Sequence, residues 1–274
     1  MSGCNTGRVV KAISGTYSVV PDDNTDGLIV CKPLGRMRFE KVSPLVGDRV
    51  RFEGSTISEL LPRRNSFVRP PVANLDAMVI LTGAVPPVTD PYVLDVLINF
   101  CENVAVEPIL VINKCDLDPY DTLWNAYTSA GFAMFRVSAT ELTGLTALQA
   151  AIENKTVAFT GDSGVGKTSL LNSLSALTLK TGEVSHKLKR GKHTTRHTEL
   201  YDIGGGTFVV DSAGFSAVEA KAPTKLNYRE FAVYAERCRF ADCRHHKEPD
   251  CAVREAVERG ELSGVRYGNY LRLL

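Results

Sequence analysis

The sequence lacks any uninterrupted apolar run long enough to cross a membrane. Its longest apolar stretch, around residues 77–88, is interrupted by Thr82, Gly83 and two prolines, and it falls well short of the roughly 20 residues that a transmembrane helix needs. The apolar segment of a secretory signal is also missing, because polar residues are scattered through residues 1–15. These absences predict a cytoplasmic protein without a membrane partner.

A strong excess of charge of either sign is missing too. The 32 Lys and Arg residues nearly balance the 31 Asp and Glu residues, so the total charge does not indicate whether the protein binds nucleic acid. Wholesale disorder is not indicated, since 44% of the residues are hydrophobic and 23% are charged, as in folded domains. The 274 residues suit two or three domains.

Short runs rich in β-branched residues, separated by turn residues, occupy the amino-terminal part. Five runs predict five strands and a small β-barrel, with an OB-like barrel as the leading candidate. The runs are residues 8–13, 17–20, 28–31, 37–39 and 50–52. The basic, proline-bounded segment of residues 62–71 is typical of a linker. We therefore expect a first domain over residues 1–66.

From residue 67 the pattern changes to short apolar runs that alternate with stretches of helical periodicity. Short continuous runs are typical of buried parallel strands, and longer periodic stretches are typical of helices. Strands are predicted at residues 75–81, 107–112, 132–137, 156–160, 199–203 and 207–210, and helices at residues 92–100, 142–151, 168–177 and 252–260. The alternation predicts an α/β domain over residues 67–220 and a small third domain over residues 221–274.

The strongest motif lies between a predicted strand and a predicted helix and matches the P-loop pattern G-x-x-x-x-G-K-[ST]. Its glycines let successive backbone N–H groups point at phosphates, and the following helix adds a favourable dipole. Lys167 is expected to bridge the β- and γ-phosphates, and Thr168 to bind Mg²⁺. The predicted nucleotide-binding residues are Gly161, Asp162, Ser163, Gly164, Val165, Gly166, Lys167, Thr168 and Ser169. A chance glycine-rich turn is the alternative.

The tetrapeptide Asn113-Lys114-Cys115-Asp116 follows a predicted buried strand and indicates guanine specificity. The Asp116 carboxylate can accept hydrogen bonds from the N1–H and the exocyclic amine of guanine, which adenine cannot donate. An unpaired acceptor then disfavours ATP by about 1–3 kcal/mol. Lys114 is expected to lie along the base, and Asn113 to tie this loop to the P-loop.

Two further segments follow predicted strands and suit the same site. Ser138 and Ala139 are expected to contact the guanine oxygen through their backbone. Asp211 is expected to hold Mg²⁺ through water, and the N–H of Gly214 to face the γ-phosphate. An ordinary turn at a strand end is the alternative for each segment.

Residues 187–197 are basic and hydrophilic and have no apolar periodicity, so they are interpreted as a switch loop. Thr194 or Thr195 is expected to bind Mg²⁺ and sense the γ-phosphate, although a solvated basic loop is the alternative. Phe215 stands where Ras-like GTPases have a glutamine that orients water, which predicts slow intrinsic hydrolysis. His193 is the candidate for polarising the water, and a solvated or RNA-facing histidine is the alternative.

The order of the motifs differs from that of ordinary regulatory GTPases, because N-K-x-D and S-A precede the P-loop instead of following it. These permuted motifs, the barrel before them, the run Arg190-Gly191-Lys192-His193-Thr194-Thr195 and a distal Cys-x4-Cys-x-His-x5-Cys pattern resemble the RsgA (YjeQ, EngC) family of bacterial small-subunit biogenesis GTPases. The resemblance implies an OB-fold, a permuted GTPase domain and a zinc domain that engage the 30S subunit and its 16S rRNA late in maturation. It further implies GTP hydrolysis that the subunit stimulates and that is coupled to release.

Three cysteines cluster beside two adjacent histidines in the last domain. Three thiolates and one imidazole suit a closed tetrahedral Zn²⁺ site, and an odd total of seven cysteines in a reducing compartment favours metal over disulfides. His245 and His246 compete for the fourth position, and the resemblance favours His245. The predicted ligands of one structural zinc are Cys238, Cys243, His245 and Cys251. Reduced core cysteines beside a surface histidine are the alternative.

Binding to RNA is predicted from a local surplus of positive charge. Residues 36–69 hold eight Lys and Arg residues against four Asp and Glu residues, a surplus that suits a phosphate backbone. The protein is expected to be a monomer that binds GTP and GDP. An RNA-binding switch with negligible hydrolysis is the second hypothesis, and a metabolic P-loop kinase, which has no use for Asp116, ranks last.

Overall fold

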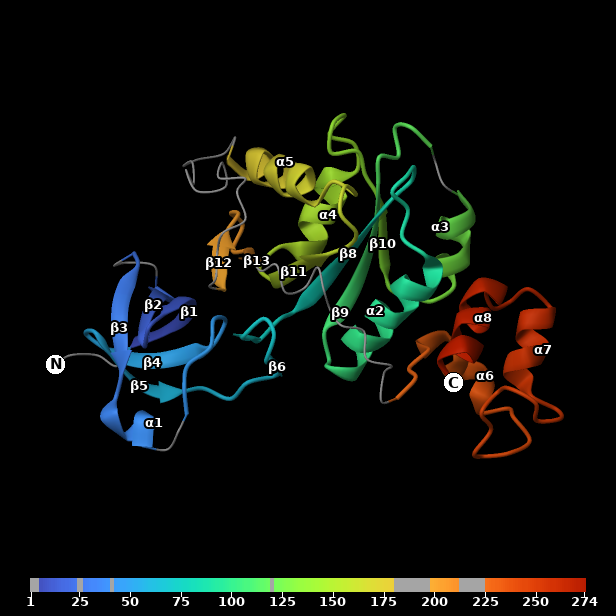
Figure 1. Cartoon of the computed structure of the whole chain (residues 1–274), viewed down its shortest axis with the longest axis horizontal. Coiled ribbons are helices and arrows are strands. Elements are labelled where there is room, and N and C mark those ends of the chain that lie inside the picture. The colour runs from blue at the N-terminus through green and yellow to red at the C-terminus, as the bar shows by residue number, and fades with distance from the viewer. Residues whose placement is uncertain (1–4, 24–26, 40–41, 119–120, 180–197, 212–224) are drawn as a thin grey trace. The chain divides into compact units, whose positions relative to one another are not determined.

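The computed structural model describes residues 5–23, 27–39, 42–118, 121–179, 198–211 and 225–274 (Figure 1). The chain forms two compact units. The first contains Met1–Met78, Gln149–Thr160 and Leu171–Ala217, and the second contains Val79–Leu148, Gly161–Leu170 and Val218–Leu274. Within the described residues, no helix combines the length and the apolar character that crossing a bilayer requires. Domain boundaries after residues 66 and 220 stay predictions.

The amino-terminal strands close into an OB-like barrel, which confirms the predicted fold of this part (Figure 1). Strand β1 pairs antiparallel with both β2 and β4, β2 pairs with β3, β3 runs parallel to β5, and β5 pairs with β4. The elements are β1 (Asn5–Ile13), β2 (Thr16–Pro21), β3 (Ile29–Pro33), α1 (Gly35–Phe39), β4 (Arg49–Glu53) and β5 (Thr56–Leu60). Every strand therefore has two neighbours, and the barrel has no open edge.

Two elements of the barrel differ from the sequence prediction. Residues 37–39 form the end of helix α1 rather than a strand, and the strand β5 was not predicted. In a strand, Met37 and Phe39 would share one face, whereas in a helix they point in nearly opposite directions. The structure buries Met37 in the barrel core and leaves Phe39 91% exposed. A run of three residues is too short to distinguish the two periods.

The barrel core is built from inward-pointing strand positions together with Met37 of helix α1. It contains Val9, Tyr17, Val19, Cys31, Met37, Val50, Phe52 and Ile57. Gly7 in β1 lies so close to β2 that an added Cβ would come within 2.6 Å of the Val20 carbonyl oxygen. A larger residue at this position would separate the two strands.

Three further strands belong to the first unit, and they confirm the predicted strand positions. Strand β13 (Phe208–Asp211) runs parallel to β11 (Thr156–Thr160) and antiparallel to β12 (Glu199–Asp202). Strand β12 in turn pairs with β1, where Lys11 Nζ lies 2.9 Å from Glu199 Oε2. A short two-stranded sheet of β6 (Ser66–Phe67) and β7 (Val72–Ala73) follows the barrel.

The second unit has a parallel sheet with strand order β10, β9, β8. Strand β8 (Ala77–Gly83) is buried along its whole length, as the continuous apolar run predicted. The other elements of this unit are α2 (Pro91–Asn103), β9 (Glu107–Asn113), α3 (Asp121–Thr128) and β10 (Ala133–Arg136). Helices α4 (Leu145–Ile152) and α5 (Lys167–Leu179) begin in this unit, and their later residues belong to the first. Helix α3 was not predicted. Helix α4 begins later than predicted because Leu142 and Gly144 have positive φ angles of 58° and 73°.

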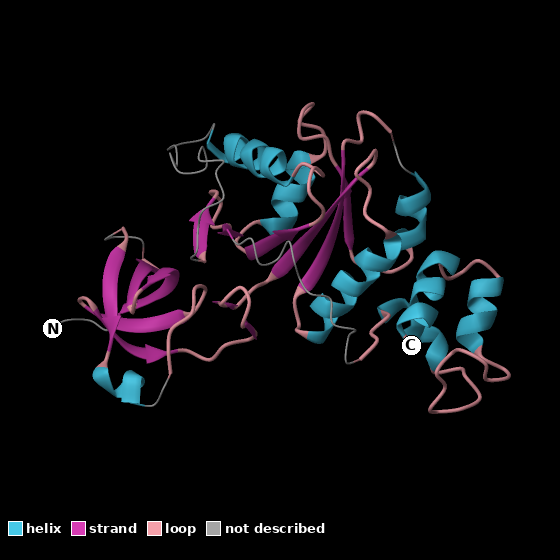
Figure 2. Cartoon of the chain, viewed as in Figure 1, coloured by secondary structure: helices cyan, strands magenta, loops and turns pink. Residues whose placement is uncertain are grey.

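Residues 225–274 form short helices and loops, and no strand occurs within them (Figure 2). The helices are η2 (Arg229–Phe231), α6 (Ala232–Ala235), α7 (Ala252–Glu258) and α8 (Gly264–Leu273). Their shared core contains aromatic residues and one of the clustered cysteines: Tyr228, Phe231, Cys251, Val253, Ala256, Leu262 and Tyr270. The predicted helix at residues 252–260 is present as α7.

Candidate nucleotide site and metal cluster

The P-loop connects β11 to α5 and requires glycine at two close approaches. Gly161 has a φ of 144°, and an added Cβ would lie 2.1 Å from the Leu81 carbonyl oxygen. Gly166 has a φ of 97°, and its Cβ would lie 2.3 Å from Asn113 Nδ2. Any other residue at either position would combine a strained backbone with a steric clash. The loop path thus depends on the spacing of these glycines.

Lys167, at the start of α5, turns back over the loop. Its Nζ donates to the carbonyl oxygens of Gly161 at 2.5 Å and Asp162 at 2.7 Å. Burial lowers the pKa of this ammonium group, and the negative charge of Asp162 partly opposes the effect. Thr168 and Ser169 are exposed, whereas Val165 is fully buried and anchors the loop.

Asn113 joins the P-loop, the N-K-x-D loop and the S-A loop through one side chain that is 3% exposed. Its Nδ2 donates to the Val165 carbonyl at 2.9 Å, and its Oδ1 accepts from the Ala139 N–H at 3.2 Å. The predicted tie between Asn113 and the P-loop is therefore present. A second link joins the loops because the Cys115 N–H donates to the Val137 carbonyl at 3.1 Å.

The remaining N-K-x-D side chains differ in exposure. Asp116 is exposed, as a carboxylate that receives a base must be. Lys114 has a φ of 64°, and its Nζ donates to the Pro86 carbonyl at 3.3 Å. Cys115 is half-buried, and burial raises the pKa of its thiol.

Ser138 is fully buried and builds the turn that follows β10. Its Oγ accepts from the Glu141 N–H at 3.0 Å, while its own N–H donates to the Thr143 carbonyl at 3.0 Å. These bonds hold the S-A loop in one conformation. Its side chain is therefore a structural support of the loop.

A fourth loop, residues 82–90, also contacts the P-loop, and the sequence analysis missed it. Thr89 is 2% exposed, and its Oγ1 donates to Asp162 Oδ2 at 2.7 Å. The Thr89 N–H donates to Thr82 Oγ1 at 3.0 Å. The available signal was positional, because this loop follows β8 at the carboxyl edge of the sheet, where ligands bind.

The distal cysteines and His245 converge with the spacing of a tetrahedral metal site. His245 Nδ1 lies 3.6 Å from the Sγ of Cys238 and 3.5 Å from the Sγ of Cys251, and these two sulfurs are 3.9 Å apart. All four donor atoms, including Cys243 Sγ, lie within 4.8 Å of one another. Tetrahedral zinc with bonds of about 2.3 Å to sulfur and 2.0–2.1 Å to nitrogen has edges of about 3.6–3.8 Å. The donor set therefore fits one zinc ion.

The loop that carries His245 is held by a second layer of contacts. The backbone N–H of Glu248 itself, followed by the N–H groups of Arg244, His246 and Lys247 that donate to its carboxylate at 2.9–3.0 Å, lowers the pKa of this side chain to about 2. Tyr267 Oη donates to the His245 carbonyl at 2.8 Å. Burial lowers the pKa of His245, which favours the neutral imidazole that binds metal.

Comparison with known proteins identifies the family. Residues 60–221 match the family model of the RsgA GTPase, and residues 6–59 match that of the RsgA N-terminal domain. The chain belongs to the RsgA family. It is 41% identical to the small ribosomal subunit biogenesis GTPase RsgA of Caldanaerobacter subterraneus subsp. tengcongensis, over 98% of this chain and 94% of the relative. It is 39% identical to the RsgA of Geobacillus sp. strain WCH70, over 97% of this chain and 94% of that one.

Two solved structures have the same fold as this RsgA family member. YjeQ from Thermotoga maritima superimposes with a TM-score of 0.81 at 29% identity, covering 98% of this chain and 96% of its own. YloQ, described as a circularly permuted GTPase, superimposes with a TM-score of 0.81 at 30% identity. The match covers 98% of this chain and 93% of the YloQ chain. The predicted fold is thus confirmed. As a member of the RsgA GTPase family the chain is a hydrolase of GTP, and such enzymes use Mg²⁺ with the nucleotide.

Several predicted residues of the RsgA chain lie outside the described residues. These are His193, Thr194, Thr195 and Gly214. Of Asp211 only the backbone is described, at the end of β13 opposite Glu199. Their roles therefore stay predictions from the sequence.

Proposed function

We propose that this chain is a GTP-hydrolysing assembly factor that binds the 30S ribosomal subunit and its 16S rRNA late in maturation. Hydrolysis is stimulated by the subunit and coupled to release of the factor. The observation that carries the proposal is the Asn113 side chain, which links the P-loop, N-K-x-D and S-A loops at 2.9 Å and 3.2 Å. Relatives with 39–41% identity are named small ribosomal subunit biogenesis GTPases, which supports the subunit as the partner.

The loops around Asn113 hold GTP in this proposal. Backbone N–H groups of the P-loop cradle the phosphates, Lys167 neutralises the β- and γ-phosphates, and Asp116 accepts hydrogen bonds from guanine. The Ala139 backbone reads the guanine oxygen. The Mg²⁺ ion is held by Thr168 and, through water, Asp211, with Thr194 or Thr195 as the switch ligand and Gly214 at the γ-phosphate.

One structural zinc ion is bound by Cys238, Cys243, His245 and Cys251. With four protein ligands the ion has no open position, so it stabilises residues 221–274 and takes no part in hydrolysis. The barrel of residues 1–66 binds RNA, and residues 67–220 form the GTPase domain. The protein acts as a cytoplasmic monomer with no membrane partner.

The hydrolytic step lacks the glutamine that Ras-like enzymes use, because Phe215 occupies its place. A phenylalanine cannot orient water, so intrinsic turnover is slow and the missing group comes from elsewhere. We assign this role to His193. Single-turnover hydrolysis by wild type and His193→Ala in the presence of 30S subunits tests the assignment, and equal rates would remove His193 from the mechanism.

The experiment that tests the function is phosphate release from GTP with and without purified 30S subunits. We expect slow release from the chain alone and a rate at least tenfold higher with subunits. Lys167→Met, which removes the phosphate-binding ammonium, serves as the inactive control. If subunits bind but do not stimulate release, the chain is a GTP-dependent RNA-binding switch, which the phenylalanine at position 215 would equally explain.

A further inference from the structure

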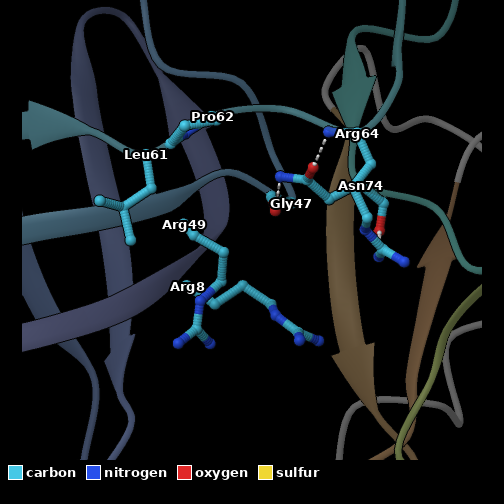
Figure 3. Close-up of a pocket in the computed structure, with 7 residues that line it drawn as sticks. All are labelled: Arg8, Gly47, Arg49, Leu61, Pro62, Arg64 and Asn74. Atoms are coloured by element: carbon cyan, nitrogen blue, oxygen red, sulfur yellow. Dashed lines mark hydrogen bonds between the residues drawn. The ribbon is translucent and has the colours of Figure 1, made fainter.

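A cavity of about 340 Å³ lies beside the barrel in the first unit (Figure 3). Three arginines line it, together with Gly47, Asn74 and two apolar residues of the segment that leaves the barrel. Figure 3 shows Arg8 and Arg49 on the barrel strands and Arg64 beside Asn74 on the facing segment. The lining contains three arginines and no acidic residue, although Asp22 and Asp76, outside the lining, pair with two of the arginines.

Arg8 and Arg49 are directly opposite each other in the antiparallel pair β1–β4. Side chains at such positions project from the same face of the sheet, and like charges placed there destabilise the pairing. Strand formation would favour an opposite-charge or β-branched pair at these two positions. The barrel thus places two positive charges side by side in the lining of the cavity.

The three guanidinium groups differ in how their charge is compensated. Arg49 forms an ion pair with Asp22, and Arg64 lies 2.7 Å from Asp76 Oδ1. Arg8 donates to the neutral Thr156 hydroxyl at 2.8 Å and lies over the Phe208 ring at 4.7 Å. Among the described residues, no carboxylate lies within ion-pair distance of Arg8. Burial, reinforced by the nearby charge of Arg49, lowers the pKa of Arg8, and the charges of Asp76 and Asp22 only partly oppose the effect.

The cavity wall is held rigidly by a buried amide. Asn74 is 7% exposed, its Nδ2 donates to the Gly47 carbonyl at 3.1 Å, and its Oδ1 accepts from the Arg64 N–H at 2.9 Å. Gly47 approaches the same segment so closely that an added Cβ would lie 2.0 Å from the Ala73 carbonyl oxygen. These contacts fix the barrel loop and the Arg64 backbone relative to each other before any ligand arrives, which lowers the entropic cost of binding.

We propose that this cavity binds a phosphate group of an RNA backbone through Arg8, Arg49 and Arg64. Guanidinium groups match phosphate oxygens with paired N–H donors, and a phosphate would supply the direct ion pair that Arg8 lacks among the described residues. The identification of the phosphate source as RNA rests on the proposed function. Two of the three arginines, Arg49 and Arg64, belong to the stretch of residues 36–69 that carries the surplus of basic residues.

The test compares variants with a matched control on the same strand. Arg49→Gln and Arg64→Gln each remove one cavity charge and leave a surface carboxylate unpaired. Arg51→Gln also removes one positive charge and leaves a surface carboxylate unpaired, but outside the cavity, because Arg51 pairs with Glu59 at 3.1 Å and is 52% exposed. Binding of full-length protein to purified 30S subunits with a non-hydrolysable GTP analogue is measured across a salt series, and thermal melting verifies that each variant is folded.

We expect Arg49→Gln and Arg64→Gln to weaken subunit binding about five- to tenfold and to reduce the slope of log K against log salt by about 0.7–0.9, the value for one lost phosphate contact. Arg51→Gln should keep the wild-type slope. Wild-type slopes in both cavity variants would overturn the cavity site and leave the proposed function intact. Failure of the wild type to bind subunits would instead overturn the proposed function and the RNA source.

Inorganic phosphate distinguishes the two sources of the anion. Thermal melting in phosphate and in chloride at equal ionic strength is compared for wild type and Arg49→Gln. If phosphate raises the melting temperature of the wild type alone while the salt slopes of subunit binding are equal, the cavity binds free phosphate and the RNA assignment is wrong. The assignment to an RNA backbone is supported if phosphate shifts the melting temperatures of wild type and Arg49→Gln equally while the salt slope of subunit binding is reduced in Arg49→Gln.

Discussion

Asn113 joins three loops of the nucleotide site through one buried side-chain amide. Both ends of that amide are used, since Nδ2 donates to Val165 and Oδ1 accepts from Ala139. An aspartate at this position would lose the donor to the Val165 carbonyl, and a leucine would lose both hydrogen bonds. The residue therefore sets the positions of these loops relative to one another, and in the proposed site it would act on GTP indirectly.

Asp116→Asn is predicted to change the preferred nucleotide. An asparagine amide cannot accept both guanine hydrogen bonds, whereas it can donate to the 2-oxo group of xanthine. GTP affinity should fall at least tenfold, in line with about 1–3 kcal/mol for an unsatisfied polar group, and xanthosine triphosphate should bind better. Equilibrium binding of the two nucleotides measures the change. The control is Asp118→Asn, which changes an exposed aspartate two residues further on. An unchanged preference for GTP over xanthosine triphosphate in Asp116→Asn would refute the assignment of Asp116 to the base.

Gly166→Ala is predicted to impair nucleotide binding and to lower stability. The new Cβ would lie 2.3 Å from Asn113 Nδ2 at a φ of 97°, so the tie between the loops must break or the backbone must strain by about 1–3 kcal/mol. Calorimetric titration with GDP and urea unfolding measure the two effects. Gly268→Ala on α8, where no atom lies within 4 Å of the added Cβ, should instead stabilise the chain by about 0.5–1 kcal/mol. Equal behaviour of the two variants would contradict the steric argument.

At the scale of elements, the loop between α6 and α7 shows why short helices persist in residues 225–274. Helices of four to ten residues are marginal by themselves, and their stability must come from packing. Cys251 precedes α7, is 3% exposed and belongs both to the aromatic core and to the metal cluster. A metal at this cluster would therefore connect the loop directly to the core.

Removal of zinc is predicted to unfold residues 225–274. Cys251→Ser, or treatment of the wild type with a zinc chelator, should reduce the metal content from about one ion per chain to near zero and decrease the helical signal in circular dichroism, because metal binding and folding are coupled in small domains. His246→Ala is the matched control, since this exposed neighbour is not part of the cluster. Retention of one zinc ion by Cys251→Ser would exclude this ligand set.

At the scale of the whole molecule, a buried arginine connects helix α2 to the carboxyl-terminal helices. Arg266 on α8 is 1% exposed and forms ion pairs with Asp95 on α2 and with Glu230 in η2, the latter at 2.5 Å. Asn269 Nδ2 donates to the second Asp95 oxygen at 2.6 Å. Helix α2 starts at Pro91, two residues after Thr89, which contacts the P-loop. The carboxyl-terminal helices are thus joined to an element adjacent to the nucleotide site.

Arg266→Met is predicted to destabilise the protein by about 3–5 kcal/mol, because it leaves two buried carboxylates without their partner. Urea unfolding measures the free energy. Arg272→Met, on the same helix but exposed over the Tyr92 ring at 4.0 Å, should cost less than about 1 kcal/mol. A loss below 1 kcal/mol in Arg266→Met would show that the network is not a stabilising connection.

The nucleotide motifs and the metal ligands could be predicted from the sequence because their chemistry is local. Glycines at positions 161 and 166 and the lysine and threonine after them lie within one loop and one helical turn, where spacing determines geometry. The cysteines at 238, 243 and 251 are similarly close in the chain. Long apolar runs such as β8 were also recognisable, since burial on both faces produces a continuous pattern.

Contacts between distant segments were decided only by the tertiary structure. Thr89 and Asp162 are 73 residues apart, and Arg266 and Asp95 are 171 residues apart. Arg8 and Arg49 meet only because the barrel closes through the β1–β4 pair. No local pattern encodes such pairs, since polar residues at these positions are equally compatible with a solvated surface. The sequence by itself determined which residues bind nucleotide and metal in our predictions, and packing decided which other residues hold, connect and surround them.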